Sequence, residues 1–298
     1  GFRGAAWAMR RLPEGATSAV VSHAFHASYS LWPSKRRWSN ENFAHVLGHD
    51  PEHPEVRRLA VAAYRTYARY IVELMRLPGL SDEEASGLVD TRTLLPLEEV
   101  WQRSNGLILT SAHIGNLEAV ARGIARHGWP ISGLADDTSF PELFEHLRRQ
   151  RAEWGVRLIP WRNLREMYGV LKRREVLALI VDWGYKPDGV PVRLFGAWTT
   201  LPAGPAALAA KTGAAIVPVA VRRETLGRFV VTYEDPIEVA SSEPGEIARA
   251  TQRIADALER TIAAAPEQWY SFKPQWPATA EEKAELATRA EALLTSFG

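Results

Sequence analysis

The chain has 298 residues, a net charge of +1 and 46% hydrophobic residues, as expected of a folded protein with one large α/β domain or two smaller ones. It contains no cysteine, which excludes disulfides, thiolate nucleophiles and cysteine-ligated zinc. No apolar run reaches the roughly 18 residues that span a bilayer. The sequence begins without an initiator Met, so removal of a leader or anchor stays open.

Residues 1–80 predict helices, and the clearest of them covers Pro54 to Leu77. At 100° per residue, four arginines of this helix fall on one line. We call them the arginine stripe: Arg58, Arg65, Arg69 and Arg76. The stripe is either a solvated helix face or an interfacial surface for anionic lipid. Residues 1–80 carry eleven Lys/Arg against six Asp/Glu, which favours a membrane surface.

From residue 97 onward, short apolar runs alternate with segments of helical length. Strands are predicted at 106–112, 156–161, 176–183, 214–221 and 228–233, and helices at 116–128, 142–155, 163–174, 204–213, 244–269 and 279–296. Nearly continuous apolar strands separated by helices indicate an α/β fold whose mostly parallel or mixed central sheet is covered on both faces. We expect an N-terminal helical, membrane-facing segment (1–95), an α/β core (96–276) and a C-terminal helix (277–298).

The stretch LILTSAHIGNLEAV (107–120) places His113 directly after a buried strand and Glu118 in the first turn of the next helix. Open α/β sheets bind ligands at the carboxyl ends of their strands. A carboxylate that accepts a hydrogen bond from Nδ1–H fixes the tautomer of a histidine and leaves Nε2 free as a base. The alternative is a histidine that caps the turn, with Glu118 favouring the helix dipole.

His45 and Asp50 have the same spacing, but HVLGHDPEHPE is polar and broken by proline, which predicts a surface loop. The spacing is therefore weak evidence without its context. No second histidine lies at metal-ligand spacing from His113, so we expect no metal there.

Four sequence blocks connect the chain to a known family. HIGNLE resembles the H-[F/S/I]-G-N-[W/L]-[E/D] block of the bacterial lipid A late acyltransferases, a family that includes the phosphatidylinositol mannoside acyltransferases. LIVDWGYKPDGVPVRLFG, LPAGPAALAAKTGAAIVPVAV and PEQWYSFKPQW resemble later blocks of the family, in order. The resemblance covers most of 95–276 and implies a glycerol-3-phosphate acyltransferase-like fold. Leu117 departs from it, since that position is more often aromatic in the family.

The resemblance implies transfer of a fatty acyl group from acyl-CoA or acyl carrier protein to a hydroxyl of a glycolipid or lipid acceptor. His113 would be the general base and Glu118 would orient and polarise it, with no covalent acyl-enzyme and no cofactor. The implied location is peripheral (monotopic), on the cytoplasmic face of the cell membrane, against anionic lipid, and no nucleic acid partner is implied. Asn116, inside the first block, is expected to contribute to substrate binding.

Asp182 is a second candidate carboxylate, because it closes the strand predicted at 176–183. It stands seven residues before Gly189, where the family often has an acid. It is either a partner of His113, a support for the acceptor site, or a turn residue, since Asp is common after strands.

Two further features are candidate anion sites. Residues 148–174 carry nine Lys/Arg against two Asp/Glu. Within this segment Arg162 and Arg165 follow a predicted strand end, where phosphates of CoA, acidic acyl carrier protein or anionic head groups could bind. Gly204 and Pro205 begin a helix whose free N–H groups could bind an anion or an oxyanion. Solvated helix faces and a plain helix start are the simpler explanations.

Two other functions fit the same residues. A thioester hydrolase would use the same histidine and acid to activate water, and a non-catalytic lipid-binding protein would bind acyl chains without them. The sequence names neither the acceptor, the donor nor the acyl chain length.

Overall fold

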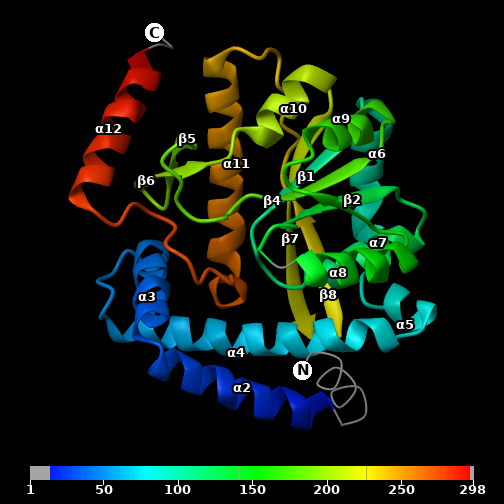
Figure 1. Cartoon of the computed structure of the whole chain (residues 1–298), viewed down its shortest axis with the longest axis horizontal. Coiled ribbons are helices and arrows are strands. Elements are labelled where there is room, and N and C mark those ends of the chain that lie inside the picture. Colours follow the sequence, from blue (N-terminus) through cyan, green and yellow to red (C-terminus); the bar gives the residue numbers. More distant parts are fainter. Residues whose placement is uncertain (1–13, 140, 226, 296–298) are drawn as a thin grey trace.

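A computed structural model of the chain describes residues 14–139, 141–225 and 227–295. Its centre is a six-stranded sheet in the order β3-β2-β4-β1-β7-β8, with a separate two-stranded hairpin, β5-β6 (Figure 1). The strands are β1 (Leu107–Ser111), β2 (Ile131–Ala135), β3 (Arg157–Pro160), β4 (Val176–Ile180), β5 (Val190–Leu194), β6 (Ala197–Leu201), β7 (Ala215–Thr225) and β8 (Arg228–Tyr233).

Helices surround the sheet and confirm the α/β fold. They are α2 (Glu14–Leu31), α3 (Pro33–Leu47), α4 (Pro54–Arg76), α5 (Asp82–Ser86), α6 (Leu95–Arg103), α7 (Leu117–Arg126), α8 (Pro141–Glu153), α9 (Leu164–Lys172), α10 (Gly204–Thr212), α11 (Pro244–Ala264) and α12 (Ala280–Thr295). Short 3₁₀ turns are η1 (Leu77–Gly79), η2 (Thr91–Leu94) and η3 (Pro266–Gln268).

The sheet is mixed, because β1 pairs in parallel with both β4 and β7 while β8 runs antiparallel to β7. Alternate residues of β1 enter two hydrophobic cores on the two faces. Ile108 packs in the core that includes α9, α10 and α11, whereas Leu107 and Leu109 pack in the core of α6 and α7. Burial on both faces explains why the strands are apolar without alternation. Since the parallel strands point the same way, the residues that follow β1 and β4 meet at one edge.

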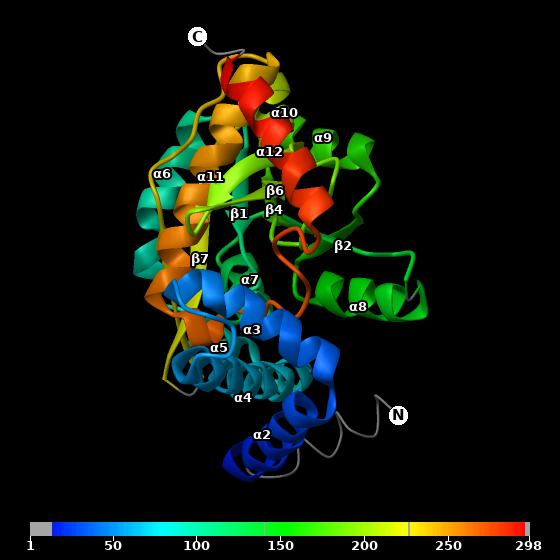
Figure 2. The same ribbon diagram turned by 90° about the vertical axis from the view of Figure 1, so that its left-hand side faces the viewer.

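The N-terminal helices lie against this edge. Helix α4 packs along α2 and contacts both α3 and η3 (Figure 1). The view turned by 90° shows α2, α3 and α4 grouped together beneath the sheet (Figure 2). Across residues 14–139, 141–225 and 227–295, no helix combines the length and apolarity needed to cross a bilayer.

The structure corrects several predicted elements. Strand β2 was not predicted, because ISGLA is short and contains Ser132 and Gly133. The β5-β6 hairpin was also missed, and α3 lies in the region predicted as helical without bounds of its own. The hairpin lies between α11 and α12 in Figure 1 and contacts both. Helix α11 ends at Ala264 rather than continuing to 269, because Pro266 begins the 3₁₀ turn η3.

Candidate active site

The chain reverses direction immediately after β1, and this places His113 at the carboxyl edge of the sheet. Gly115 has a φ of +63°, and a Cβ there would lie 1.9 Å from the carbonyl oxygen of Val221. Only glycine fits this conformation and this close approach. The end of η3 and the residues after it hold the turn from the other side: Gly115 N–H donates to the Gln268 carbonyl at 3.1 Å, and Tyr270 N–H donates to the His113 carbonyl at 2.8 Å.

Asp182 follows β4, and the pairing of β4 with β1 brings it to His113. Ser111 of β1 pairs with Ile180 of β4. His113 and Asp182 each follow these paired residues by two positions, so they leave the sheet side by side. The distance from His113 Nδ1 to Asp182 Oδ1 is 2.7 Å, and His113 N–H also donates to the carboxylate at 3.0 Å. Nδ1 is therefore occupied, and Nε2 is the ring nitrogen left for a ligand. The His113 side chain is 39% exposed, whereas that of Asp182 is 3% exposed.

Other groups fix the position of Asp182. The indole N–H of Trp269 donates to Oδ2 at 2.8 Å, and the amide of Gln275 donates to the Asp182 carbonyl at 3.1 Å. Trp269 is fully buried and packs edge-on against Phe43 of α3. Two side chains from the segment after η3 thus hold Asp182, one through its carboxylate and the other through its backbone carbonyl. The sequence had marked this segment only as a family block.

The electrostatics of His113 favour its charged form. Burial by itself would lower the pKa of His113, but the charge of Asp182 and its hydrogen bond outweigh burial and the nearby Lys273, so the pKa is raised. This is the arrangement of a histidine that takes up a proton during a reaction.

Glu118 lies in the first turn of α7, as expected, but its carboxylate contacts Arg151 of α8 instead of His113. Arg151 Nε donates to Oε2 at 2.7 Å, and Nη2 bonds the other oxygen, Oε1. The expected hydrogen bond between Glu118 and His113 was wrong, because Asp182 occupies Nδ1. Glu118 was expected as the partner because it is five residues from His113 in the sequence. The pairing of β1 with β4 instead brings Asp182, 69 residues away, to the imidazole.

Asn116 is buried and both ends of its side-chain amide are committed to protein groups. Oδ1 accepts from Ala119 N–H at 3.0 Å and so caps α7, while Nδ2 donates to Glu73 Oε2 at 2.9 Å. This geometry gives no support to the expected contact with substrate.

A buried polar cluster behind the turn was not predicted. We call it the Glu73 network; its members are Glu73, Asn116, Arg223 and Gln268. Arg223 bonds both oxygens of Glu73, at 2.6 and 2.7 Å, and Gln268 bonds the backbone N–H and carbonyl of Arg223 at 2.7 and 3.1 Å. Burial would lower the pKa of Arg223, but the hydrogen bond and charge of Glu73 raise it. One feature of the sequence could have indicated this network: Glu73 is an acidic residue on the otherwise apolar face of α4.

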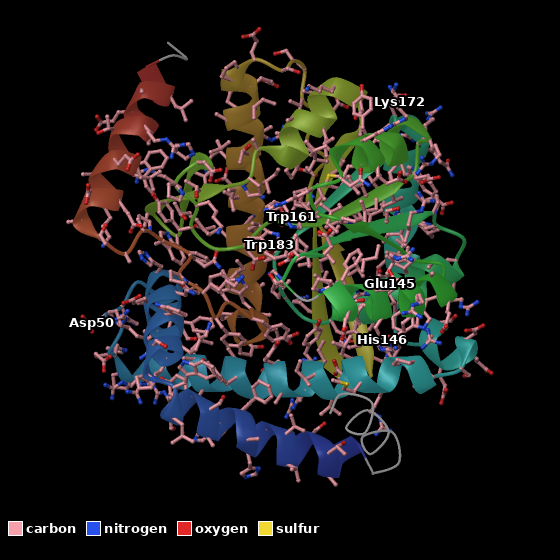
Figure 3. The ribbon with its side chains drawn as sticks, viewed as in Figure 1. Asp50, Glu145, His146, Trp161, Lys172 and Trp183 are labelled. Atoms are coloured by element: carbon pink, nitrogen blue, oxygen red, sulfur yellow. The ribbon has the colours of Figure 1, made fainter. Side chains whose placement is uncertain are left out.

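Exposed large hydrophobic residues lie beside His113 and after β3. Trp183 contacts the imidazole edge-on, with ring centroids 5.7 Å apart, and its side of the site also carries Lys273. Trp161, Leu164 and Trp183 are 44%, 67% and 38% exposed. Figure 3 labels Trp161 and Trp183 near the middle of the view, above α8.

The two predicted anion-binding arginines are exposed. Arg162 lies over the ring of Trp161, 4.7 Å from its centroid, and Arg165 is on the first turn of α9. Gly204 and Pro205 begin α10, as expected, with Gly204 exposed and Pro205 buried. Helix α10 packs against α9 and α11. The structure gives no direct contact between these four residues and His113, among the residues that it describes.

His45 differs from the prediction of a surface loop. It lies on α3 and stacks on Trp276 with ring centroids 4.0 Å apart. Burial, followed by the charge of Lys283, lowers its pKa. The loop begins only at Gly48, which ends α3 in the left-handed conformation.

Comparison with known proteins shows the family to which this chain belongs. The family model described as bacterial lipid A biosynthesis acyltransferase matches residues 3–278. A phosphatidylinositol mannoside acyltransferase of Mycolicibacterium smegmatis is 28% identical over 294 residues, covering 95% of this chain and 94% of that protein. The protein of the same name from Mycobacterium tuberculosis is 29% identical over 297 residues, covering 96% and 91%. With a family match over nearly its whole length, this chain belongs to the bacterial lipid A biosynthesis acyltransferases and is an acyltransferase of lipid biosynthesis.

Proposed function

We propose that this enzyme transfers a fatty acyl group from a thioester donor to a hydroxyl of a mannosylated inositol lipid or a related glycolipid, with His113 as general base. The observation that carries the proposal is the pairing of His113 Nδ1 with Asp182 at 2.7 Å, which leaves Nε2 as the available base. The names of the two mycobacterial relatives support the class of acceptor.

In the proposed reaction the acceptor hydroxyl gives its proton to Nε2 as its oxygen bonds to the thioester carbonyl carbon. The imidazolium formed is stabilised by the Asp182 carboxylate, which keeps its own charge. Collapse of the tetrahedral intermediate breaks the C–S bond, and the departing thiolate takes the proton back from Nε2. Atoms and charge balance, and the histidine returns to its starting form.

Asp182 is the positioning residue in this proposal, through its bonds to the ring and the backbone of His113. Glu118 acts differently, by holding Arg151 and so fixing α8 beside the start of α7. The donor is acyl-CoA or acyl carrier protein. The exposed cations Arg162, Arg165 and Lys273 support a donor or acceptor that carries negative charge.

We also propose that the enzyme works while bound peripherally to an anionic membrane. At the junction of α2 and α3, Leu31 and Trp32 are 81% and 59% exposed. Three basic residues follow in the next turn: Lys35, Arg36 and Arg37. Exposed apolar and aromatic groups next to basic ones suit an interface with anionic lipid. Within the arginine stripe, Arg65 and Arg69 line a groove of about 800 Å³, together with His23 and His26; α2, α4, the end of β7 and η3 enclose it.

The test is acyl transfer by the purified chain with vesicles that contain a mannosylated inositol lipid, followed by mass spectrometry. Acyl-CoA and acyl carrier protein are compared as donors. We expect an acylated lipid, and His113→Ala should lower its rate by about 100- to 10,000-fold. His127→Ala, an exposed histidine at the end of α7, is the matched control. Cleavage of the thioester without any acylated lipid would indicate a hydrolase, and lipid binding without either product would indicate a non-catalytic protein.

A further inference from the structure

The loop between α3 and α4, residues 48–53, has a backbone fixed by local hydrogen bonds. His49 N–H donates to the Ala44 carbonyl at 3.1 Å, and His53 N–H donates to the Asp50 carbonyl at 2.9 Å. The Asp50 carboxylate accepts from Glu52 N–H at 2.8 Å. The loop therefore holds its two histidines in a defined relation to each other and to the first turn of α4.

Three side chains with metal-binding atoms converge on this loop. One donor atom from each of His49, His53 and Glu55 lies within 4.8 Å of the other two. His49 Nε2 is 3.4 Å from Glu55 Oε2, and the two imidazole rings stack with centroids 4.2 Å apart. The other oxygen of Glu55 faces Arg58 at 3.6 Å, so Oε2 is the one that points to the histidines.

We propose that His49, His53 and Glu55 form a binding site for Zn²⁺ or a similar borderline divalent metal. Zinc bonds to His nitrogen and carboxylate oxygen are about 2.0–2.2 Å long, so tetrahedral ligand atoms lie about 3.3 Å apart. His49 and Glu55 already have this separation. Imidazole ligands select zinc, nickel and cobalt over magnesium and calcium, which prefer oxygen alone.

His53 completes the site by a small rotation of its ring. In the structure its Nδ1 accepts a long hydrogen bond of 3.3 Å from Glu55 N–H, and metal binding replaces that weak bond. The side chains of His49 and Glu55 are 41% and 52% exposed, so they can move toward a shared ion without disturbing the core. Three protein ligands leave the fourth position to water or to an anionic ligand.

This site is separate from the catalytic one. Figure 3 labels Asp50, which lies on the loop, at the left of the view, away from Trp183, which contacts His113. A metal here would join the end of α3 to the start of α4. It would also stabilise the folded chain, because an ion that binds only the native state raises the midpoint of unfolding.

The experiment is calorimetric titration of Zn²⁺ into tag-free, chelator-treated full chain, with Mg²⁺ as a comparison ion. We expect one zinc per chain, no competition by Mg²⁺, and a higher midpoint of thermal unfolding with zinc. Loss of an outer-shell partner already weakens metal binding by about 10- to 100-fold, so His49→Ala and Glu55→Gln should each weaken it at least that much. His127→Ala should bind like the wild type. Absence of zinc binding, or affinity unchanged in both site variants, overturns the proposal.

Discussion

Replacing Asp182 with Asn tests the assignment of the carboxylate beside His113, because it removes the charge and keeps the shape. The two oxygens of Asp182 serve different donors, the His113 ring at 2.7 Å and the Trp269 indole at 2.8 Å. An amide offers one oxygen and one NH₂ group, so one of these donors loses its acceptor. The variant therefore loses the charge that stabilises the imidazolium, and it breaks the hydrogen bond to either the His113 ring or the Trp269 indole.

The expected loss in turnover follows from the geometry. Two unit charges about 4 Å apart interact by about 4 kcal/mol at an effective dielectric constant of 20, which corresponds to about 1,000-fold in rate. The His113 side chain is 39% exposed, and water screens part of this interaction. We therefore expect kcat to fall by about 100- to 1,000-fold in Asp182→Asn.

The pH profile of kcat/KM gives an independent measurement. Asp182 raises the pKa of His113, while burial and Lys273 lower it. Without the carboxylate only the lowering effects remain, so the acidic limb of the profile should move to lower pH. Glu118→Gln is the matched control and should leave that limb in place, because Glu118 bonds Arg151. An Asp182→Asn variant that keeps more than a tenth of wild-type kcat, or whose acidic limb does not move, would refute the reasoning.

Three further changes have expected results. Gly115→Ala forces a Cβ toward the Val221 carbonyl and should abolish either activity or soluble expression. Measuring activity per amount of folded protein distinguishes a damaged site from a protein that does not fold. Glu73→Gln leaves the buried charge of Arg223 without its partner, so the free energy of unfolding measured in urea should fall by about 3–5 kcal/mol. The control Glu224→Gln changes an exposed residue and should leave that free energy almost unchanged. Replacing the arginine stripe with glutamines should weaken sedimentation with anionic vesicles by about 1 kcal/mol per residue in low salt and hardly at all in high salt; unchanged sedimentation would indicate a solvated helix face.

The sequence predicted what depends on local pattern. The apolar run 107–111 and the helix after it placed His113 at a strand end, and the run 176–180 placed Asp182 at another. Whether these two ends meet depends on which strands are neighbours, and the order β3-β2-β4-β1-β7-β8 is a property of the whole sheet. Proximity in the sequence favoured Glu118 as the partner of His113, and the tertiary structure supplied Asp182.

The parts that were missed share a physical cause. Strand β2 and the β5-β6 hairpin contain Gly133 and Pro191, which weaken a strand pattern, and both elements gain their stability from neighbours. The bounds of α3 were not predicted, because this helix is predominantly polar and its buried Asn42 donates to the Ser271 and Lys273 carbonyls. Such polar contacts between distant segments leave no periodic signal in a single sequence.

The Glu73 network has a mechanical consequence. Glu73 belongs to α4, a helix of 23 residues, and it bonds directly to Asn116, which caps the helix that follows His113. A helix of this length is about 35 Å long. Because Glu73 joins α4 to the turn that carries His113, the position of the imidazole relative to α4 is fixed by the protein and does not vary with the flexibility of a linker.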